Sequence, residues 1–400
     1  MKTLVFPIAV LCMAAHLTFA QTAVPALKWK FRTGGPIVGA PVPDGGLIFA
    51  GSADSTLYAI DTESGKSRWT FRTGGPIKSA VCVDGSRLFL QGGDGVAYAL
   101  EKSSGRVLWT FHTGGEKIYP LYGYADYYQA SPVCHKGLVY LGSGDGNMYA
   151  LDAAGGGLVW RFQTGGVVHA TPVVYGDTLY AGSFDGNLYA LDARTGALAW
   201  KFKSVGHRFF PLGEMQGAAV AGGGLVFVGS RDYNLYAVDA AKGYCHWNKP
   251  FPKGWIMALT LCDSALYAGT SDDDVLVAFD PATGQERWRT NVQFNIFGPP
   301  ALNDSLLCFG TLQGKLFALD RRSGAIRWTF ATDGYRANCS RYFPDENRID
   351  KNDFYGRVGT PEGYIEALHR LGAVFSTPAI AGKLLVFSST DGGIYALEWP

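Results

Sequence analysis

Residues 57–75 read Leu57-Tyr58-Ala59-Ile60-Asp61-Thr62-Glu63-Ser64-Gly65-Lys66-Ser67-Arg68-Trp69-Thr70-Phe71-Arg72-Thr73-Gly74-Gly75. The alternating run at 57–60 predicts a β-strand. The stretch from Asp61 to Gly65 predicts a hairpin turn, in which the glycine adopts a positive φ. The segment through Trp69 then predicts the neighbouring strand that returns.

This segment is one copy of an internal repeat. A glycine follows the acidic residue after four positions and a tryptophan follows it after eight, and neither spacing varies in seven copies. The acidic residues, including an eighth near the C-terminus, are Asp61, Glu101, Asp152, Asp192, Asp239, Asp280, Asp320 and Glu398. The glycines are Gly65, Gly105, Gly156, Gly196, Gly243, Gly284 and Gly324. The tryptophans are Trp69, Trp109, Trp160, Trp200, Trp247, Trp288 and Trp328.

Each copy is also preceded by two shorter strand-like segments, such as residues 172–174 and 178–182. Four strands in about 40 residues are typical of one propeller blade. A single blade cannot bury both of its faces, so the blades must stack on their neighbours. We expect the repeated tryptophan to pack between adjacent sheets.

The chain ends predict the number of blades. Glu398 lies two residues from the C-terminus, so no tryptophan strand follows it, while an unmatched tryptophan strand stands at residues 29–31 and begins with Trp29. Pairing this N-terminal strand with the last three strands closes the ring and removes two sheet edges. The sequence therefore predicts an all-β fold, an eight-bladed β-propeller of four-stranded blades.

The composition excludes one class of partner. The 400 residues are 47% hydrophobic, which is enough for a large core, and 35 Lys and Arg balance 34 Asp and Glu. A net charge of +1 does not supply the basic surface that nucleic-acid binding needs, so we expect no nucleic-acid partner.

Residues 1–20 predict a cleavable secretory signal peptide, followed by a single propeller over residues 21–400. Lys2 precedes a run without charged side chains other than His16, and Thr18-Phe19-Ala20 ends it with small residues at the cleavage positions. Cys12 follows the bulky Leu11, so lipid attachment is not expected there. We expect a periplasmic or secreted protein without a transmembrane span, although an uncleaved N-terminal anchor stays open.

Six cysteines follow residue 20, and an even number in an exported chain permits disulfides. Cys82, Cys134, Cys262 and Cys308 lie in apolar strand runs of different repeats. We expect most of the cysteines to be buried, small hydrophobic residues.

The repeat resembles that of the pyrroloquinoline-quinone-type propellers, which carry the same acidic residue, Ser/Thr-Gly and Trp spacing from about residue 28 to 400. The resemblance implies two alternatives: a quinoprotein alcohol or sugar dehydrogenase with pyrroloquinoline quinone and calcium, or a non-enzymatic propeller similar to the outer-membrane assembly factor BamB. The sequence lacks the adjacent cysteines that the dehydrogenases usually carry. We therefore favour the non-enzymatic alternative and expect no cofactor, no catalytic residue and no metal ligand.

Three insertions interrupt the repeat, near residues 115–130, 204–217 and 333–373. Each falls between a tryptophan strand and the next inner strand, so all three are expected at one face of the propeller, where binding residues commonly lie. Within the third, Thr360-Pro361-Glu362 predicts the start of a helix that runs to about Leu371 and ends at Gly372.

The insertions are rich in tyrosine, phenylalanine and arginine, which often anchor binding partners. The candidate binding residues are Tyr119, Tyr122, Tyr124, Tyr127, Tyr128, His207, Arg208, Phe209, Phe210, Tyr335 and Arg336. We expect them to bind a protein, peptide or glycan of the cell envelope, or, alternatively, to pack on one another and stabilise the insertions. The acidic stretch at 345–353 is interpreted as a solvated loop, because it lacks the regular spacing of a calcium loop.

Overall fold

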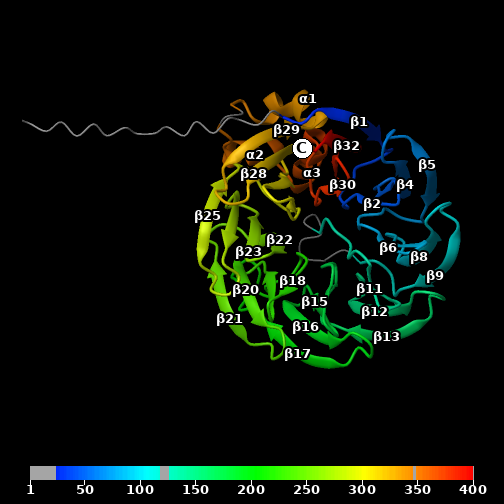
Figure 1. Cartoon of the computed structure of the whole chain (residues 1–400). Helices are drawn as coiled ribbons and strands as arrows, with labels where there is room; N and C mark the ends of the chain where they lie inside the picture. The colour runs from blue at the N-terminus through cyan, green and yellow to red at the C-terminus, as the bar shows by residue number, and fades with distance from the viewer. Residues whose placement is uncertain (1–23, 118–125, 346–347, 400) are drawn as a thin grey trace, which may run out of the picture.

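The computed structural model describes residues 24–117, 126–345 and 348–399. Eight antiparallel sheets of four strands each are arranged around a ring, and the chain follows the ring from blue to red (Figure 1). This confirms the predicted eight-bladed propeller. The predicted signal peptide lies outside the described residues, among which no helix has the length and apolar character needed to cross a membrane.

Each blade begins with a short strand beside the central channel and continues with a second strand that is largely buried. The innermost strands are β2 (Val42–Asp44), β6 (Cys82–Asp84), β10 (Val133–His135), β14 (Val173–Tyr175), β18 (Val220–Gly222), β22 (Ile256–Cys262), β26 (Ala301–Leu302) and β30 (Ala379–Ala381). The second strands are β3 (Leu47–Gly51), β7 (Arg87–Gln91), β11 (Leu138–Gly142), β15 (Thr178–Gly182), β19 (Leu225–Gly229), β23 (Ala265–Thr270), β27 (Leu306–Gly310) and β31 (Leu384–Ser388).

The third strand carries the Leu-Tyr-Ala pattern, and the fourth carries the tryptophan at the outer edge of the ring. The third strands are β4 (Thr56–Asp61), β8 (Val96–Glu101), β12 (Asn147–Asp152), β16 (Asn187–Asp192), β20 (Asn234–Asp239), β24 (Val275–Phe279), β28 (Lys315–Asp320) and β32 (Gly393–Glu398). The fourth strands are β5 (Ser67–Arg72), β9 (Val107–His112), β13 (Leu158–Gln163), β17 (Leu198–Lys203), β21 (Cys245–Pro250), β25 (Glu286–Asn291), β29 (Ile326–Ala331) and, from the N-terminus, β1 (Leu27–Arg32).

The ring closes as the sequence predicts. β1 is the outer strand of the last sheet and pairs antiparallel with β32, so that Trp29 lies opposite Ala396 and Phe31 opposite Ile394. The last sheet is therefore built from both ends of the chain. β1 pairs with the edge of β32, which would otherwise be unpaired.

The repeated tryptophan joins neighbouring blades, because its ring lies on the turn glycine of the next blade. Gly65 has a φ of 67°, and a Cβ on it would lie 2.6 Å from the Trp29 ring. The Trp29 indole N–H donates to the Thr62 carbonyl at 2.9 Å. The same contacts recur for all seven glycines, with indole hydrogen bonds between 2.9 and 3.2 Å.

Three helices lie in the third insertion: α1 (Asp333–Tyr342), α2 (Lys351–Val358) and α3 (Pro361–Leu371). The sequence predicted α3, and its ends are as expected: the Thr360 hydroxyl accepts from Gly363 N, and Gly372 is left-handed with a φ of 68°. The acidic stretch is not simply a solvated loop, since Asp350 caps α2 by accepting from the N–H groups of residues 352 and 353.

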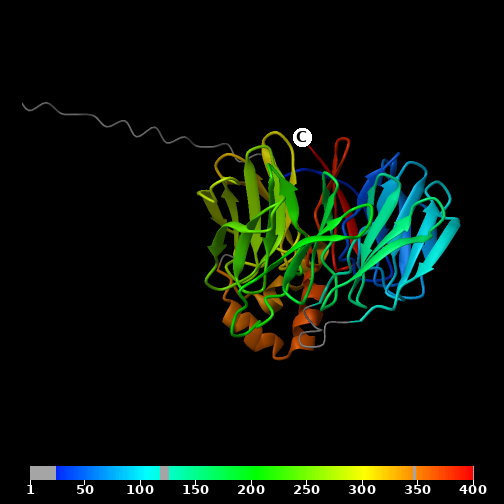
Figure 2. The same ribbon diagram turned by 90° about the horizontal axis from the view of Figure 1, so that it is seen from below.

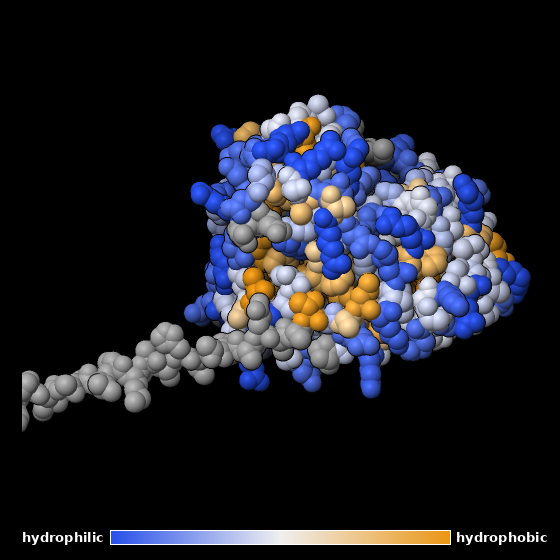
Figure 3. Space-filling model, turned by 90° about the horizontal axis from the view of Figure 1, so that it is seen from above, coloured by the Kyte–Doolittle hydropathy of each residue, from blue (hydrophilic) through white to orange (hydrophobic). Residues whose placement is uncertain are grey.

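The expectation that most of the six cysteines are buried is wrong, since Cys308 alone among them is buried. Cys82 and Cys134 form a disulfide between the inner strands β6 and β10 of neighbouring blades. Cys308 is buried, whereas Cys245 is exposed. The outer edge of the ring is predominantly hydrophilic on the side that Figure 3 presents, with hydrophobic residues in a few patches.

Candidate functional site

The helices of the third insertion project from one side of the disc (Figure 2). Residues of the first and second insertions lie against them, because Tyr127, Phe210 and Tyr355 line the same cavity. One end of the propeller therefore carries the additions to the repeat.

The first insertion reaches across the central channel. Tyr128 donates a hydrogen bond to the carbonyl of Phe375 at 2.9 Å, although the two residues are 247 positions apart in the chain. The Tyr127 ring lies 4.9 Å from the Phe375 ring and 5.9 Å from the Phe297 ring, centre to centre. These contacts tie the insertion to blades on the other side of the ring.

A buried histidine contacts two acidic residues of this insertion. His169 Nδ1 lies 2.8 Å from Asp126 Oδ1, and its Nε2 lies 3.1 Å from Glu116 Oε2. All three side chains are at least nine-tenths buried. Burial disfavours the charged imidazole, but the hydrogen bonds that it donates to Asp126 and Glu116 outweigh this effect and raise the pKa of His169 to about 9. His169 is therefore a cation between two carboxylates at neutral pH.

The second insertion packs its aromatic side chains against two blades. The ring of His207 lies 4.5 Å from that of Tyr233, and Phe210 lies 5.3 Å from Trp255 in an edge-on arrangement. Arg208 and Phe209 are exposed, with the guanidinium 4.4 Å from the phenyl ring. Phe210 thus packs inward, whereas the side chains of Arg208 and Phe209 face the solvent.

The third insertion contains its own aromatic core. Phe354 is fully buried, and its ring lies 5.4 Å from both Phe294 and Phe343. Tyr335 is 3% exposed and belongs to this core, and the exposed Arg336 lies over Phe330. Neither of these two candidate binding residues lines the cavity, so their contacts are those of the packing alternative.

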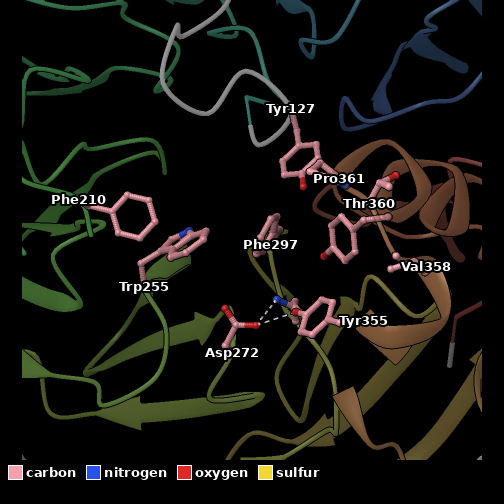
Figure 4. Close-up of a pocket in the computed structure, with 12 residues that line it drawn as sticks. Tyr127, Phe210, Trp255, Asp272, Phe297, Tyr355, Val358, Thr360 and Pro361 are labelled. Atoms are coloured by element: carbon pink, nitrogen blue, oxygen red, sulfur yellow. Dashed lines mark hydrogen bonds between the residues drawn. The ribbon is translucent and has the colours of Figure 1, made fainter. Parts of the chain in front are cut away.

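A cavity of about 330 Å³ lies where the insertions meet (Figure 4). Six aromatic side chains line it: Tyr127, Phe210, Trp255, Phe297, Tyr355 and Tyr364. Its other lining residues are Asp272, Asn295, Val358, Gly359, Thr360 and Pro361. Such a lining, mostly apolar with few polar groups, is typical of a binding site.

Asp272 is the charged residue of this lining. Its carboxylate accepts hydrogen bonds from the Tyr355 hydroxyl at 3.2 Å and the Asn295 amide at 3.4 Å. Lys351 lies 3.2 Å from Asp272 and 2.5 Å from Asp274. Burial raises the pKa of Asp274 to about 6, against the opposing effect of Lys351.

The sequence analysis did not predict Asp272 or Trp255 as site residues, although a comparison of the repeats could have singled out Asp272. Asp272 follows Ser271 in a turn where five blades carry a small or apolar residue: Ala53, Gly93, Gly144, Phe184 and Leu312. The remaining two blades carry Arg231 and Thr390. A carboxylate at this position is not needed for the blade itself.

Among the other candidate binding residues, Tyr127 and Phe210 line the cavity. Tyr128 and His207 do not line it and make the contacts described above. Three candidates lie outside the described residues: Tyr119, Tyr122 and Tyr124.

The cavity does not fit pyrroloquinoline quinone with calcium. The quinone is a tricarboxylate and requires cationic partners, whereas Asp272 is the charged side chain of the lining. Calcium takes six to eight oxygen ligands. No group of three or more His, Cys, Asp or Glu side chains is placed to hold a metal ion in the part of the chain that the structure describes.

Several solved structures share this fold. BamB from Moraxella catarrhalis is 19% identical, with a TM-score of 0.69 over 94% of this chain and 100% of that one. The designed Ika8 protein is 15% identical, with a TM-score of 0.69 over 92% and 97% of the two chains. Quinohemoprotein alcohol dehydrogenase from Comamonas testosteroni is 13% identical, with a TM-score of 0.69 over 93% and 76%. At these identities the likeness shows the fold alone.

A family model matches the sequence itself, over residues 21–123, 127–254 and 187–338. None of the curated proteins matches this sequence. The family match extends over most of the repeat array, in which the acidic, glycine and tryptophan positions recur. The chain therefore belongs to the family of propellers described as outer membrane protein assembly factor BamB.

Proposed function

We propose that the chain is an exported, non-enzymatic binding scaffold of the cell envelope, which presents its insertion face to a partner protein. The observation that carries this proposal is the convergence of three insertions, from three different blades, on one aromatic-lined cavity. A rigid ring that displays loops at one end is a common arrangement for recognition.

The family supports a protein partner, because its description names an assembly factor. The predicted signal peptide at residues 1–20 supports export to the periplasm or beyond. The exposed residues Arg208 and Phe209 of the second insertion are of the types that commonly anchor protein interfaces.

The quinoprotein alternative has less support. Two quinohemoprotein alcohol dehydrogenases share the fold, the second from Pseudomonas putida HK5 with 13% identity and a TM-score of 0.66. The acidic, aromatic cavity does not favour the quinone, so we derive no redox step. Addition of the quinone and calcium to the purified protein, followed by dye reduction with alcohols or sugars, tests this alternative directly.

Site-specific photo-crosslinking in the exporting cell tests the scaffold proposal. A photoreactive residue at Phe209, which is 52% exposed on the insertion face, should give a discrete adduct with one envelope protein. The matched control is Leu198, which is 47% exposed on the outer strand β17. The same adducts at both positions, or no adduct at Phe209, would contradict the proposal.

A further inference from the structure

The walls of the cavity favour a positive charge. Six aromatic rings surround it, and the face of an aromatic ring carries negative potential that attracts cations. In Figure 4, Trp255 lies to the left, Asp272 lies below and is joined by a hydrogen bond to Tyr355 on its right, and Tyr127 lies above. Aromatic rings combined with a carboxylate form the kind of cage that recognises organic ammonium groups.

The carboxylates beside the cavity add to this preference, whereas the buried guanidinium of Arg231, 5.4 Å from the Trp255 ring and 5.6 Å from the Phe210 ring, opposes it. Asp272, Asp273 and Asp274 are consecutive, and Lys351 is the cation that contacts two of them. Burial raises the pKa of Tyr355, and the Asp272 carboxylate raises it further. Ionisation of the hydroxyl beside Asp272 is thus disfavoured, as expected where the local potential is negative.

Two buried polar atoms of the lining have no hydrogen-bond partner among the described residues: Trp255 Nε1 and Asn295 Oδ1. Asn295 is 3% exposed, and its amide nitrogen already donates to Asp272. Its oxygen is therefore left as an acceptor, and the indole N–H of Trp255 is left as a donor. Buried polar atoms normally have partners, so a ligand that satisfies these two atoms supplies both a hydrogen-bond donor and an acceptor oxygen, and a single hydroxyl group can do both.

We propose that this cavity binds a small organic ammonium cation that also carries an oxygen acceptor. The volume of about 330 Å³ matches the lower end of small-molecule sites. Such a cation is either a free small molecule or the lysine side chain of a partner protein together with its backbone carbonyl. The proposed cation site lies on the same face of the propeller as the proposed scaffold surface. Only the second source, a lysine side chain of a partner protein, rests on the proposed scaffold function.

Calorimetric titration of the full mature chain tests the charge preference. Choline and 3,3-dimethyl-1-butanol have the same shape, but the alcohol has carbon in place of the charged nitrogen. We expect choline to bind at least about tenfold more tightly, because the neutral isostere has no cation–π attraction to the rings and no charge for Asp272 to attract. Equal affinities, or no binding of either choline or capped lysine, would overturn the proposal.

Capped lysine, Nα-acetyl-lysine N-methylamide, distinguishes the two sources. Tighter binding of choline than of capped lysine assigns the site to a free small molecule. Tighter binding of capped lysine assigns it to a side chain of the partner. Both results support a cation site and differ in its natural occupant.

Variants locate the binding. Asp272→Asn should weaken choline binding by about tenfold and leave the binding of the neutral alcohol unchanged. Asp304→Asn, at an exposed carboxylate that does not line the cavity, is the matched control and should have no effect. Unchanged choline binding by Asp272→Asn would contradict the assignment.

A second variant guards against a folding defect in the first. Trp255→Phe keeps an aromatic ring but removes the indole N–H, so it should weaken choline binding severalfold more than it weakens tetramethylammonium binding, which offers no oxygen. Equal losses of affinity for both cations would show that Trp255 Nε1 does not bind the oxygen of the ligand. Choline binding without a crosslinked partner at Phe209 would reject the scaffold function alone, and crosslinking without cation binding would reject this inference alone.

Discussion

At the scale of single residues, His169 shows how one buried side chain positions part of the first insertion. Its two ring nitrogens face Asp126 and Glu116, which are ten positions apart in the first insertion. Asp126 directly precedes Tyr127 and Tyr128. The imidazole therefore holds the backbone beside Tyr127 and Tyr128 in place.

We predict that His169→Ala destabilises the fold by about 3–5 kcal/mol, because it leaves two buried carboxylates without their cation. Urea denaturation monitored by circular dichroism measures this change. His246→Ala, at an exposed histidine, is the control and should change stability by less than about 0.5 kcal/mol. Equal stability of the two variants would show that the carboxylates find other partners.

The same histidine predicts a dependence on pH. The pKa of about 9 in the folded chain lies above the ordinary histidine pKa of 6.5, so the contribution of His169 to stability is complete below pH 6.5 and is lost as the pH rises through 9. The expected loss is on the order of 2–3 kcal/mol. Urea midpoints at pH 6 and pH 9.5 measure it, and in His169→Ala the difference between these two midpoints should largely disappear.

At the scale of elements, the turn of each blade and the tryptophan of the preceding blade form one unit. The glycine is required twice, once for its positive φ and once because a side chain would collide with the indole. The invariant spacing in the sequence reflects this contact between blades as well as the hairpin itself.

Two adjacent glycines test this explanation. Gly156 has a φ of 75°, and a Cβ on it would lie 2.5 Å from the Trp109 ring, whereas a Cβ on Gly157 would meet nothing within 4 Å. We predict that Gly156→Ala lowers the unfolding free energy by about 2–4 kcal/mol and that Gly157→Ala changes it by less than about 1 kcal/mol. Thermal and urea unfolding of the two variants provide the comparison, and equal losses would reject it.

The helices differ in how far the sequence predicts them. α3 carries local signals at both ends, at Thr360-Pro361 and at Gly372. α1 contains Gly334 and Asn338, and α2 contains Gly356, all poor helix formers. These two helices depend on packing around Phe354 from distant strands, which no local pattern records.

At the scale of the whole molecule, ring closure holds the two ends of the chain together. β1 supplies the outer strand of the last blade, and Trp29 and Phe31 pack on a cluster that includes Ile60 and Ile394. Without β1, the edge of β32 is unpaired and this cluster is exposed.

We predict that a chain beginning at Gly34 loses cooperative folding or associates through the free edge of β32. Size-exclusion chromatography with light scattering, together with urea unfolding, would detect either outcome. A chain beginning at Val24 keeps β1 and serves as the control. A stable monomer of the shorter chain would show that β1 is dispensable for the ring.

The sequence by itself determined the blades, their number, the closure of the ring and the face on which the insertions lie, because turn and strand signals are local and recur at a constant spacing. Only the tertiary structure decided which insertion side chains reach the cavity and which are buried, as Tyr127 and Tyr335 illustrate. It also brought Asp272 beside Tyr355, 83 positions away in the chain. Such a contact depends on how separate blades stack around a common axis. The packing that determines this stacking involves residues from the whole ring, so no single segment of the sequence predicts the contact.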